Sequence, residues 1–187
     1  MLNTLSQKFH AWTTGWRVLL LLVADALMMG YIMPLAGGLM ALAANASVMP
    51  LDLMFFYTPD QAFAMIEKYG EAGRDLYMKI ELTADIIYPI IYTLFYGLLL
   101  SWLFQRGFKS DSKMQKYNVM PVGAWFFDML ENVGIVSMLV MYPSQPAVMA
   151  WLTMIFGSIK WAFFLVTVGL TLYGLVRAIM NGFRKQA

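Results

Sequence analysis

The sequence predicts an all-α, polytopic membrane protein, a bundle of four transmembrane helices with a short amphipathic helix on its outer side. Its 187 residues are 60% hydrophobic and only 13% charged, with a mean hydropathy of +0.63. That composition is far more apolar than the composition of a soluble domain. Four apolar stretches reach the roughly 20 residues that a helix needs to cross a bilayer, and they lie at about 16–40, 80–104, 119–142 and 148–176. Little chain remains outside them, so we expect one transmembrane domain over 1–187.

The basic residues outside these stretches predict the orientation of the chain. Nine Lys and Arg lie before the first span, between the second and third spans, and after the fourth, whereas three lie between the first and second spans. Because cytoplasmic segments carry an excess of Lys and Arg, we expect both termini in the cytoplasm. The segment 41–79 is then an outer loop, and the protein is expected in the cell (inner or plasma) membrane.

The outer loop is predicted to contain one short helix, over 59–69. The run Thr58-Pro59-Asp60 is typical of a helix start, with Pro in the first turn. Apolar side chains recur at near-helical spacing as far as Tyr69, which favours a helix lying on the bilayer or capping the bundle. We expect Gly70 and Gly73 to end it.

The composition also excludes several classes of site. Cys is absent and the single His, His10, precedes the first span, so thiolate zinc sites, haem held by two histidines and histidine-rich di-metal sites are excluded. Basic residues sit at the ends of spans and form no aromatic-interleaved stripe, which argues against nucleic acid as a partner. We expect no metal site and no cofactor.

Lys160 interrupts the apolar run of the fourth span and needs an anionic partner there. Asp128, Glu131 and Asn132 stand at i, i+3 and i+4 on the third span, at a depth that Lys160 reaches from the opposite side. The sequence therefore predicts a buried ion pair of Lys160 with Asp128 or Glu131. The alternative is that this pair fixes helix register and has no chemical role.

A second polar face is predicted on the second span. Glu81, Asp85, Tyr88, Tyr92 and Tyr96 recur at spacings of four, three, four and four, which places them on one helical face. Glu81 also fits a plain role at the helix N-terminus, where the macrodipole favours an acid. Proline 89 follows Asp85 by one turn and frees a backbone carbonyl.

These features together predict an outward-opening intramembrane pocket that is acidic and aromatic. Ionisable residues inside a membrane are functional-site candidates by default, and Asp25, in the first span, and Trp125, one turn before Asp128, complete the set. The predicted ligand-binding residues are Asp25, Glu81, Asp85, Tyr88, Tyr92, Trp125, Asp128, Glu131, Asn132 and Lys160. Because several acids share one buried lysine, the pocket is expected to bind a cation or a small lipid-like or cationic ligand.

Three alternatives remain open from the sequence. One is a membrane-embedded enzyme acting on a lipid-like substrate, with Asp85 or Glu131 as general acid or base and Tyr88 as proton donor. Another is proton-coupled or cation transport, as an oligomer because four helices enclose little volume. The third is a structural subunit. Membrane lipid is a partner in each case.

Three strings resemble a family of small bacterial four-helix membrane proteins that carry no assigned activity. They are Gly73-Arg74-Asp75-Leu76-Tyr77, Asp85-Ile86-Ile87-Tyr88-Pro89-Ile90-Ile91-Tyr92 and Phe127-Asp128-Met129-Leu130-Glu131-Asn132. The resemblance covers most of 50–165 and implies that these residues belong to one site. The topology is also distantly similar to the EXPERA proteins, which include sterol isomerases and the sigma-2 receptor. That likeness implies intramembrane acids that bind cationic or carbocation-like ligands, but the isomerases' histidine has no counterpart in these spans.

Overall fold

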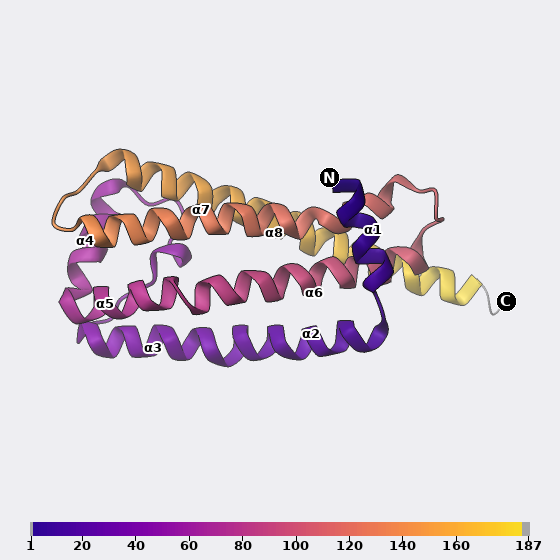
Figure 1. Cartoon of the computed structure of the whole chain (residues 1–187), viewed down its shortest axis with the longest axis horizontal. Coiled ribbons are helices and arrows are strands. Elements are labelled where there is room, and N and C mark those ends of the chain that lie inside the picture. The colour runs from indigo at the N-terminus through magenta and orange to yellow at the C-terminus, as the bar shows by residue number, and fades with distance from the viewer. Residues whose placement is uncertain (1, 185–187) are drawn as a thin grey trace. The chain divides into compact units, whose positions relative to one another are not determined.

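The computed structural model describes residues 2–184, and every regular element in that part of the chain is a helix (Figure 1). Lys185, counted above among the cytoplasmic basic residues, lies outside the described residues. The α-helices are α1 Leu2–Trp12, α2 Gly15–Leu27, α3 Met33–Ala44, α4 Pro59–Lys68, α5 Gly70–Glu81, α6 Ala84–Gly107, α7 Met120–Met141 and α8 Ala147–Arg184. The 3-10 helices are η2 Leu51–Leu53 and η3 Lys113–Val119, and η1 Met28–Ile32 is a π-helix.

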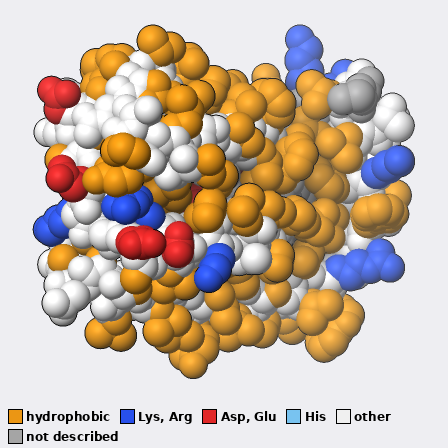
Figure 2. Space-filling model, turned by 60° about the vertical axis from the view of Figure 1, so that its left-hand side comes forward, with side chains coloured by type: hydrophobic (Ala, Val, Ile, Leu, Met, Phe, Trp, Pro, Cys, Tyr) orange, Lys and Arg blue, Asp and Glu red, His pale blue; other side chains and the backbone are white. Residues whose placement is uncertain are grey.

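Four helical segments among the described residues are long and apolar enough to cross a membrane, as the sequence predicts. They are Gly15–Ala44, Gly70–Gly107, Lys113–Met141 and Ala147–Gly182. In the most apolar part of the first and fourth segments only 11% of the residues are buried, against 44% in the second and third. Hydrophobic side chains also cover most of the face seen in Figure 2. Apolar surface on this scale marks contact with a partner or a membrane.

The first segment is one continuous helical path with a π-helical turn inside it. Pro34 follows this turn, and its ring removes the N–H that would bond to the carbonyl of Gly30. A local change to the wider π turn can accommodate the missing backbone hydrogen bond. Asn45 ends α3 in the left-handed conformation, with φ of 47°.

The contacts of the chain divide into two compact units. Unit 1 consists of residues up to Asp25, Ile90–Trp125 and the chain from Trp161 onward, and unit 2 consists of Ala26–Pro89 and Phe126–Lys160. The long helices therefore contribute residues to both units. Each unit has its own hydrophobic core.

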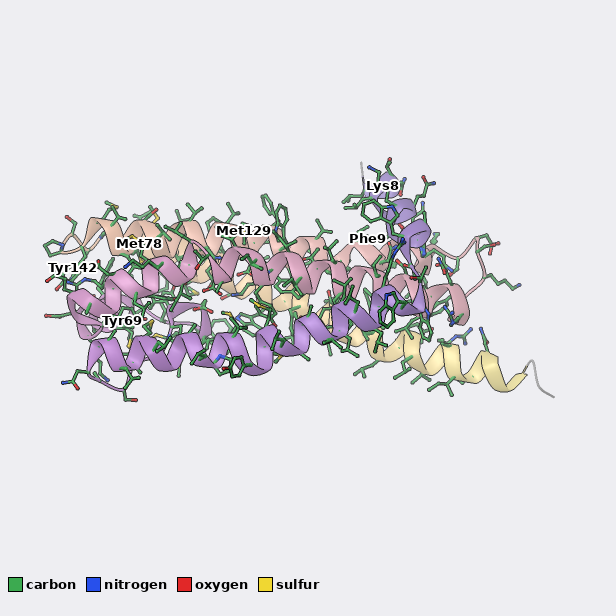
Figure 3. All side chains as sticks on the ribbon, turned by 60° about the horizontal axis from the view of Figure 1, so that its bottom comes forward. Lys8, Phe9, Tyr69, Met78, Met129 and Tyr142 are labelled. Carbon is green, nitrogen blue, oxygen red and sulfur yellow. The ribbon has the colours of Figure 1, made fainter. Side chains whose placement is uncertain are left out.

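In unit 1, α1 packs on α6 through Phe9, which is labelled in Figure 3. Gly97 of α6 allows this approach, because a Cβ at that position would lie 2.8 Å from the Phe9 ring. Beneath α1 lies a neutral polar network centred on Asn118, which is fully buried. Its side-chain amide donates to the Ser6 carbonyl at 3.1 Å and to the Ser101 hydroxyl at 2.8 Å. This network joins α1, α6 and the end of η3.

In unit 2, the core forms where α4 and α5 cover residues of α3, α7 and α8. The predicted helix over 59–69 is confirmed as α4, and Thr58 caps it: the Thr58 hydroxyl accepts from the Gln61 N–H, and the Gln61 side chain accepts from the Thr58 N–H. Gly70 ends α4 with a φ of 62°, as expected. The expected break at Gly73 is wrong, because Gly73 lies inside α5 and packs within contact distance of Ala44.

Two buried tyrosines fix the segment that precedes α4. The Tyr69 hydroxyl donates to the Met49 carbonyl at 2.7 Å, and the Tyr77 hydroxyl accepts from the Leu51 N–H at 2.8 Å. Both rings are buried and meet edge to face with centroids 5.3 Å apart (Tyr69 is labelled in Figure 3). The segment 49–52 is therefore held by specific hydrogen bonds to the core of unit 2.

Candidate functional site

The predicted ion pair is confirmed, and Lys160 binds both candidate acids. The Lys160 Nζ lies 2.5 Å from Glu131 Oε2 and 3.4 Å from Asp128 Oδ1. All three residues are buried, with Glu131 only 2% exposed. Lys160 comes from α8 and both acids come from α7, so the interaction joins two helices within unit 2.

Glycines bring α8 close enough to α7 for this arrangement. A Cβ at Gly157 would collide with the Glu131 carboxylate, and a Cβ at Gly134 would collide with the Thr153 hydroxyl. Small residues at helix contacts let two backbones approach closely. The Glu131 carboxylate consequently lies between the Gly157 backbone and Lys160. A side chain at position 157 would occupy the space that this carboxylate fills.

Asn132 joins α7 to α6 at the backbone carbonyl that Pro89 frees. A proline leaves the carbonyl four residues earlier without its helical partner, and here that carbonyl belongs to Asp85. The Asn132 side chain donates to this carbonyl at 2.8 Å. The buried amide therefore satisfies the backbone group that Pro89 frees, and it fixes the backbone of Asp85 beside α7.

Glu81 is the buried acid with the least compensation. It is 1% exposed, and neither carboxylate oxygen has a hydrogen-bond partner among the described residues. The Tyr77 hydroxyl, which donates to Asp52, also acts favourably on the Glu81 carboxylate. The charged neighbours of Glu81 are the acids Asp52, Asp85 and Glu131. The helix breaks immediately after Glu81, at Leu82 and Thr83, so this residue ends α5 and is not continuous with the α6 face that carries Asp85.

Two residues of the segment between α3 and α4, Asp52 and Tyr57, join this group, and neither is among the predicted site residues. Asp52 accepts a hydrogen bond of 2.9 Å from the Tyr77 hydroxyl. Tyr57 is 2% exposed, and its hydroxyl has no hydrogen-bond partner among the described residues. Burial, followed by the charges of Glu131 and Asp52, raises the pKa of the Tyr57 hydroxyl well above its usual range. The group is therefore a neutral phenol that faces the carboxylates.

We call this set the acid cluster of unit 2. It contains the acids Asp52, Glu81, Asp85, Asp128 and Glu131, together with Tyr57, Asn132 and Lys160. Tyr88, a predicted member, belongs to unit 2 and is half-buried on α6. The cluster draws on α5, α6, α7, α8 and the segment around η2, so distant parts of the sequence contribute to it.

Three predicted site residues belong to unit 1. Tyr92 is buried and meets Phe164 edge to face at 6.4 Å between ring centroids. Asp25 is buried, its Oδ1 has no hydrogen-bond partner among the described residues, and its charge acts on Tyr96. Trp125 is half-buried. Asp25 and Tyr92 are therefore connected through Tyr96 and Phe164, whose ring centroids lie 5.7 Å apart.

Unit 2 also contains an open cavity of about 640 Å³, beside α4. One wall comes from the segment between α3 and α4, with Met49, Leu53, Met54, Phe55 and Tyr57. The other wall comes from α4, with Gln61, Ala64, Met65 and Lys68. None of the predicted ligand-binding residues lines this cavity, so the outward-opening pocket around the acids stays a prediction.

The arrangement of acids does not resemble a metal cage. Among residues 2–184, no group of three or more His, Cys, Asp or Glu side chains is placed to hold a metal ion. The acid cluster therefore places several carboxyl groups together in a buried position, next to the Lys160 ammonium and the neutral Tyr57 phenol. The chain matches no family model, no curated protein and no solved structure.

Proposed function

We propose that this chain is a polytopic membrane protein that binds a cation, or the cationic group of a small ligand, at the acid cluster of unit 2. The membrane assignment is supported by four apolar helical segments whose outer surfaces expose large hydrophobic side chains. Lipid is the partner that covers such surfaces without a polar rim. The distribution of Lys and Arg favours both termini in the cytoplasm of a cell bounded by this inner or plasma membrane.

The observation that carries the binding proposal is the charge imbalance of the acid cluster. Five acids lie around one buried lysine that pairs with Asp128 and Glu131. The Tyr77 hydroxyl that acts on Glu81 already donates to Asp52. Buried charges are normally paired or bound to ions, because an isolated charge in a medium of low dielectric is very costly. A cation placed beside Glu81 and Asp85 would reduce this imbalance by one charge.

The class of cation follows from the same geometry. A site for Ca²⁺ or Mg²⁺ needs several oxygen ligands at fixed distances, and the described acids are not grouped in that way. A monovalent ion binds with less strict ligand geometry, and an organic ammonium needs no fixed set of oxygen ligands. The neutral Tyr57 phenol supplies a hydroxyl oxygen for such a group.

The proposal is tested with Glu81→Gln, and Glu71→Gln is the matched control because Glu71 is an exposed acid on the same helix. The purified full-length protein in phosphatidylcholine nanodiscs is titrated with K⁺, Na⁺ or tetramethylammonium, and N-methylglucamine replaces them in the reference buffer. Melting temperature reports binding. We expect at least one of the three cations to raise it, with the midpoint shifted about ten- to a hundredfold in Glu81→Gln.

Glu71→Gln should leave that midpoint unchanged. The proposal fails if none of the three cations changes the melting temperature of the wild-type protein. It also fails if Glu71→Gln weakens the response as strongly as Glu81→Gln does, because the effect would then come from general surface charge.

A further inference from the structure

The cavity beside α4 is an open depression with the volume of a small-molecule site, and most of the residues that line it are exposed. Its volume of about 640 Å³ falls in the range of roughly 300–1,000 Å³ that is usual for ligand pockets. Most of its lining is apolar or aromatic, including Met49, Met54, Met65 and Phe55. Methionine side chains adapt their shape to flexible apolar ligands. The lining therefore suits a hydrocarbon chain.

The walls of the cavity are held in place without a ligand. Hydrogen bonds from Tyr69 to Met49 and from Leu51 to Tyr77 fix one wall. The capping box of Thr58 and Gln61 fixes the start of the other. Phe56 takes a φ of 52° between these walls, which is rare for a bulky side chain and reverses the chain direction locally. A preformed cavity binds more tightly, because less ordering is needed on binding.

The polar groups of the lining indicate the charge of the ligand. Lys68 is the charged residue among those that line the cavity. The Gln61 side-chain oxygen accepts the Thr58 N–H, which leaves its NH₂ group as a donor. An ammonium and an amide donor at the edge of an apolar cavity favour an anionic group, so the cavity differs in charge preference from the acid cluster.

Tyr57 separates the two sites. Its ring lines the cavity, whereas its hydroxyl responds to the charges of the acid cluster. The adjacent side chains Phe55 and Phe56 are 58% and 78% exposed, and they provide an apolar approach to the cavity from its surroundings.

We infer that this cavity binds a single-chain anionic amphiphile such as a fatty acid, with the hydrocarbon chain against the methionines and the carboxylate at Lys68. This site is independent of the proposed cation site, and either proposal can fail without the other. The test uses dodecanoate as the probe and dodecyltrimethylammonium as the matched amphiphile of opposite charge.

Because the chain has no cysteine, one introduced thiol reports occupancy of the cavity. Ala64→Cys places the thiol in the wall of the cavity, and Ala72→Cys places it on an exposed position of α5 as the control. The full-length variants in phosphatidylcholine nanodiscs are labelled with a maleimide at increasing amphiphile concentration. We expect dodecanoate to slow labelling at position 64 at least fivefold, and to leave position 72 unchanged.

Charge selectivity is tested by combining Ala64→Cys with a change at Lys68. Lys68→Gln should raise the half-protecting dodecanoate concentration about fivefold, the effect of losing one exposed ion pair, and Lys68→Glu should reverse the preference toward dodecyltrimethylammonium. The inference is overturned if dodecanoate gives no protection at position 64, if it protects position 72 equally, or if the two amphiphiles protect equally whatever residue stands at 68.

Discussion

In unit 1 the polar side chains around Asn118 form a neutral hydrogen-bonded network and Asp25 is a separate buried acid, whereas unit 2 buries several carboxylates around a single lysine. In unit 1, the Asn118 amide donates to Ser6 and Ser101, and the Gln115 amide donates to the Phe104 carbonyl at 3.1 Å. In unit 2, the buried acids outnumber the lysine, and Glu81 lacks a hydrogen-bond partner among the described residues. A neutral network with bonded donors stabilises the fold by itself. A charged group without compensation stores an unfavourable free energy that a ligand can relieve.

The comparison predicts its largest effect at Lys160. Removing one partner of a buried ion pair costs about 3–5 kcal/mol, because the other charge stays buried alone. We expect a loss of unfolding free energy of this size for Lys160→Met, measured by denaturant unfolding in detergent, and within about 0.5 kcal/mol for the exposed Lys79→Met.

Adding Glu131→Leu to Lys160→Met should recover part of the loss, since the carboxylate at 2.5 Å is then absent as well. If the losses of unfolding free energy in the double variant are strictly additive, Lys160 and Glu131 do not stabilise each other. The contrast between the charged cluster of unit 2 and the neutral network of unit 1 would then have no energetic basis.

A smaller effect is expected where α8 approaches Glu131. Gly157→Ala places a methyl group into the Glu131 carboxylate, and overpacking of this kind costs about 1–3 kcal/mol. Gly169→Ala on the same helix meets nothing within 4 Å, so the better helix propensity of Ala should leave stability unchanged or raise it by about 0.5–1 kcal/mol. Thermal unfolding of both variants provides the measurement. Equal behaviour of the two would contradict the close contact.

The smallest effect is predicted in unit 1. Ser101→Ala removes the hydroxyl that accepts from Asn118, and the loss of one such hydrogen bond costs about 0.5–1.5 kcal/mol. Ser137→Ala removes a hydroxyl that bonds only to its own helix, at the Val133 carbonyl, and should change stability by less than about 0.5 kcal/mol. Cation titrations should be unaffected by Ser101→Ala. A shifted midpoint would mean that the neutral network also serves binding.

Composition and periodicity predict the spans and the ion pair. Each of these two features follows from the free energy of burying a few apolar or charged residues. An apolar run of sufficient length requires a helix, and Lys160 requires an acid at its own depth. The boundaries depend on local chemistry that periodicity does not show. The second segment begins at Gly70, ten residues before the predicted start, because α5 continues through Gly73 against α3.

The missed residues lie in segments without a strong periodic signal. Asp52 and Tyr57 reach the acid cluster through a loop whose path depends on hydrogen bonds from Tyr69 and Tyr77, and no pattern in the sequence indicates those bonds. Helix α1 was also missed, although Leu2, Leu5 and Phe9 recur at helical spacing and Phe9 is buried. The spacing of these apolar residues is enough to predict an amphipathic helix at α1.

Under the proposed membrane assignment, the short connection between α7 and α8 has a consequence for how the chain enters the bilayer. Only residues 142–146 separate the two helices, so the acids of α7 leave the ribosome shortly before Lys160. Each ionised side chain that enters hydrocarbon by itself costs about 2.5–3.5 kcal/mol on the scale of the insertion machinery. Membrane insertion of α7 and α8 as one hairpin, with the salt bridge already formed, avoids exposing either charge to lipid, and the brevity of this connection makes that route available during synthesis.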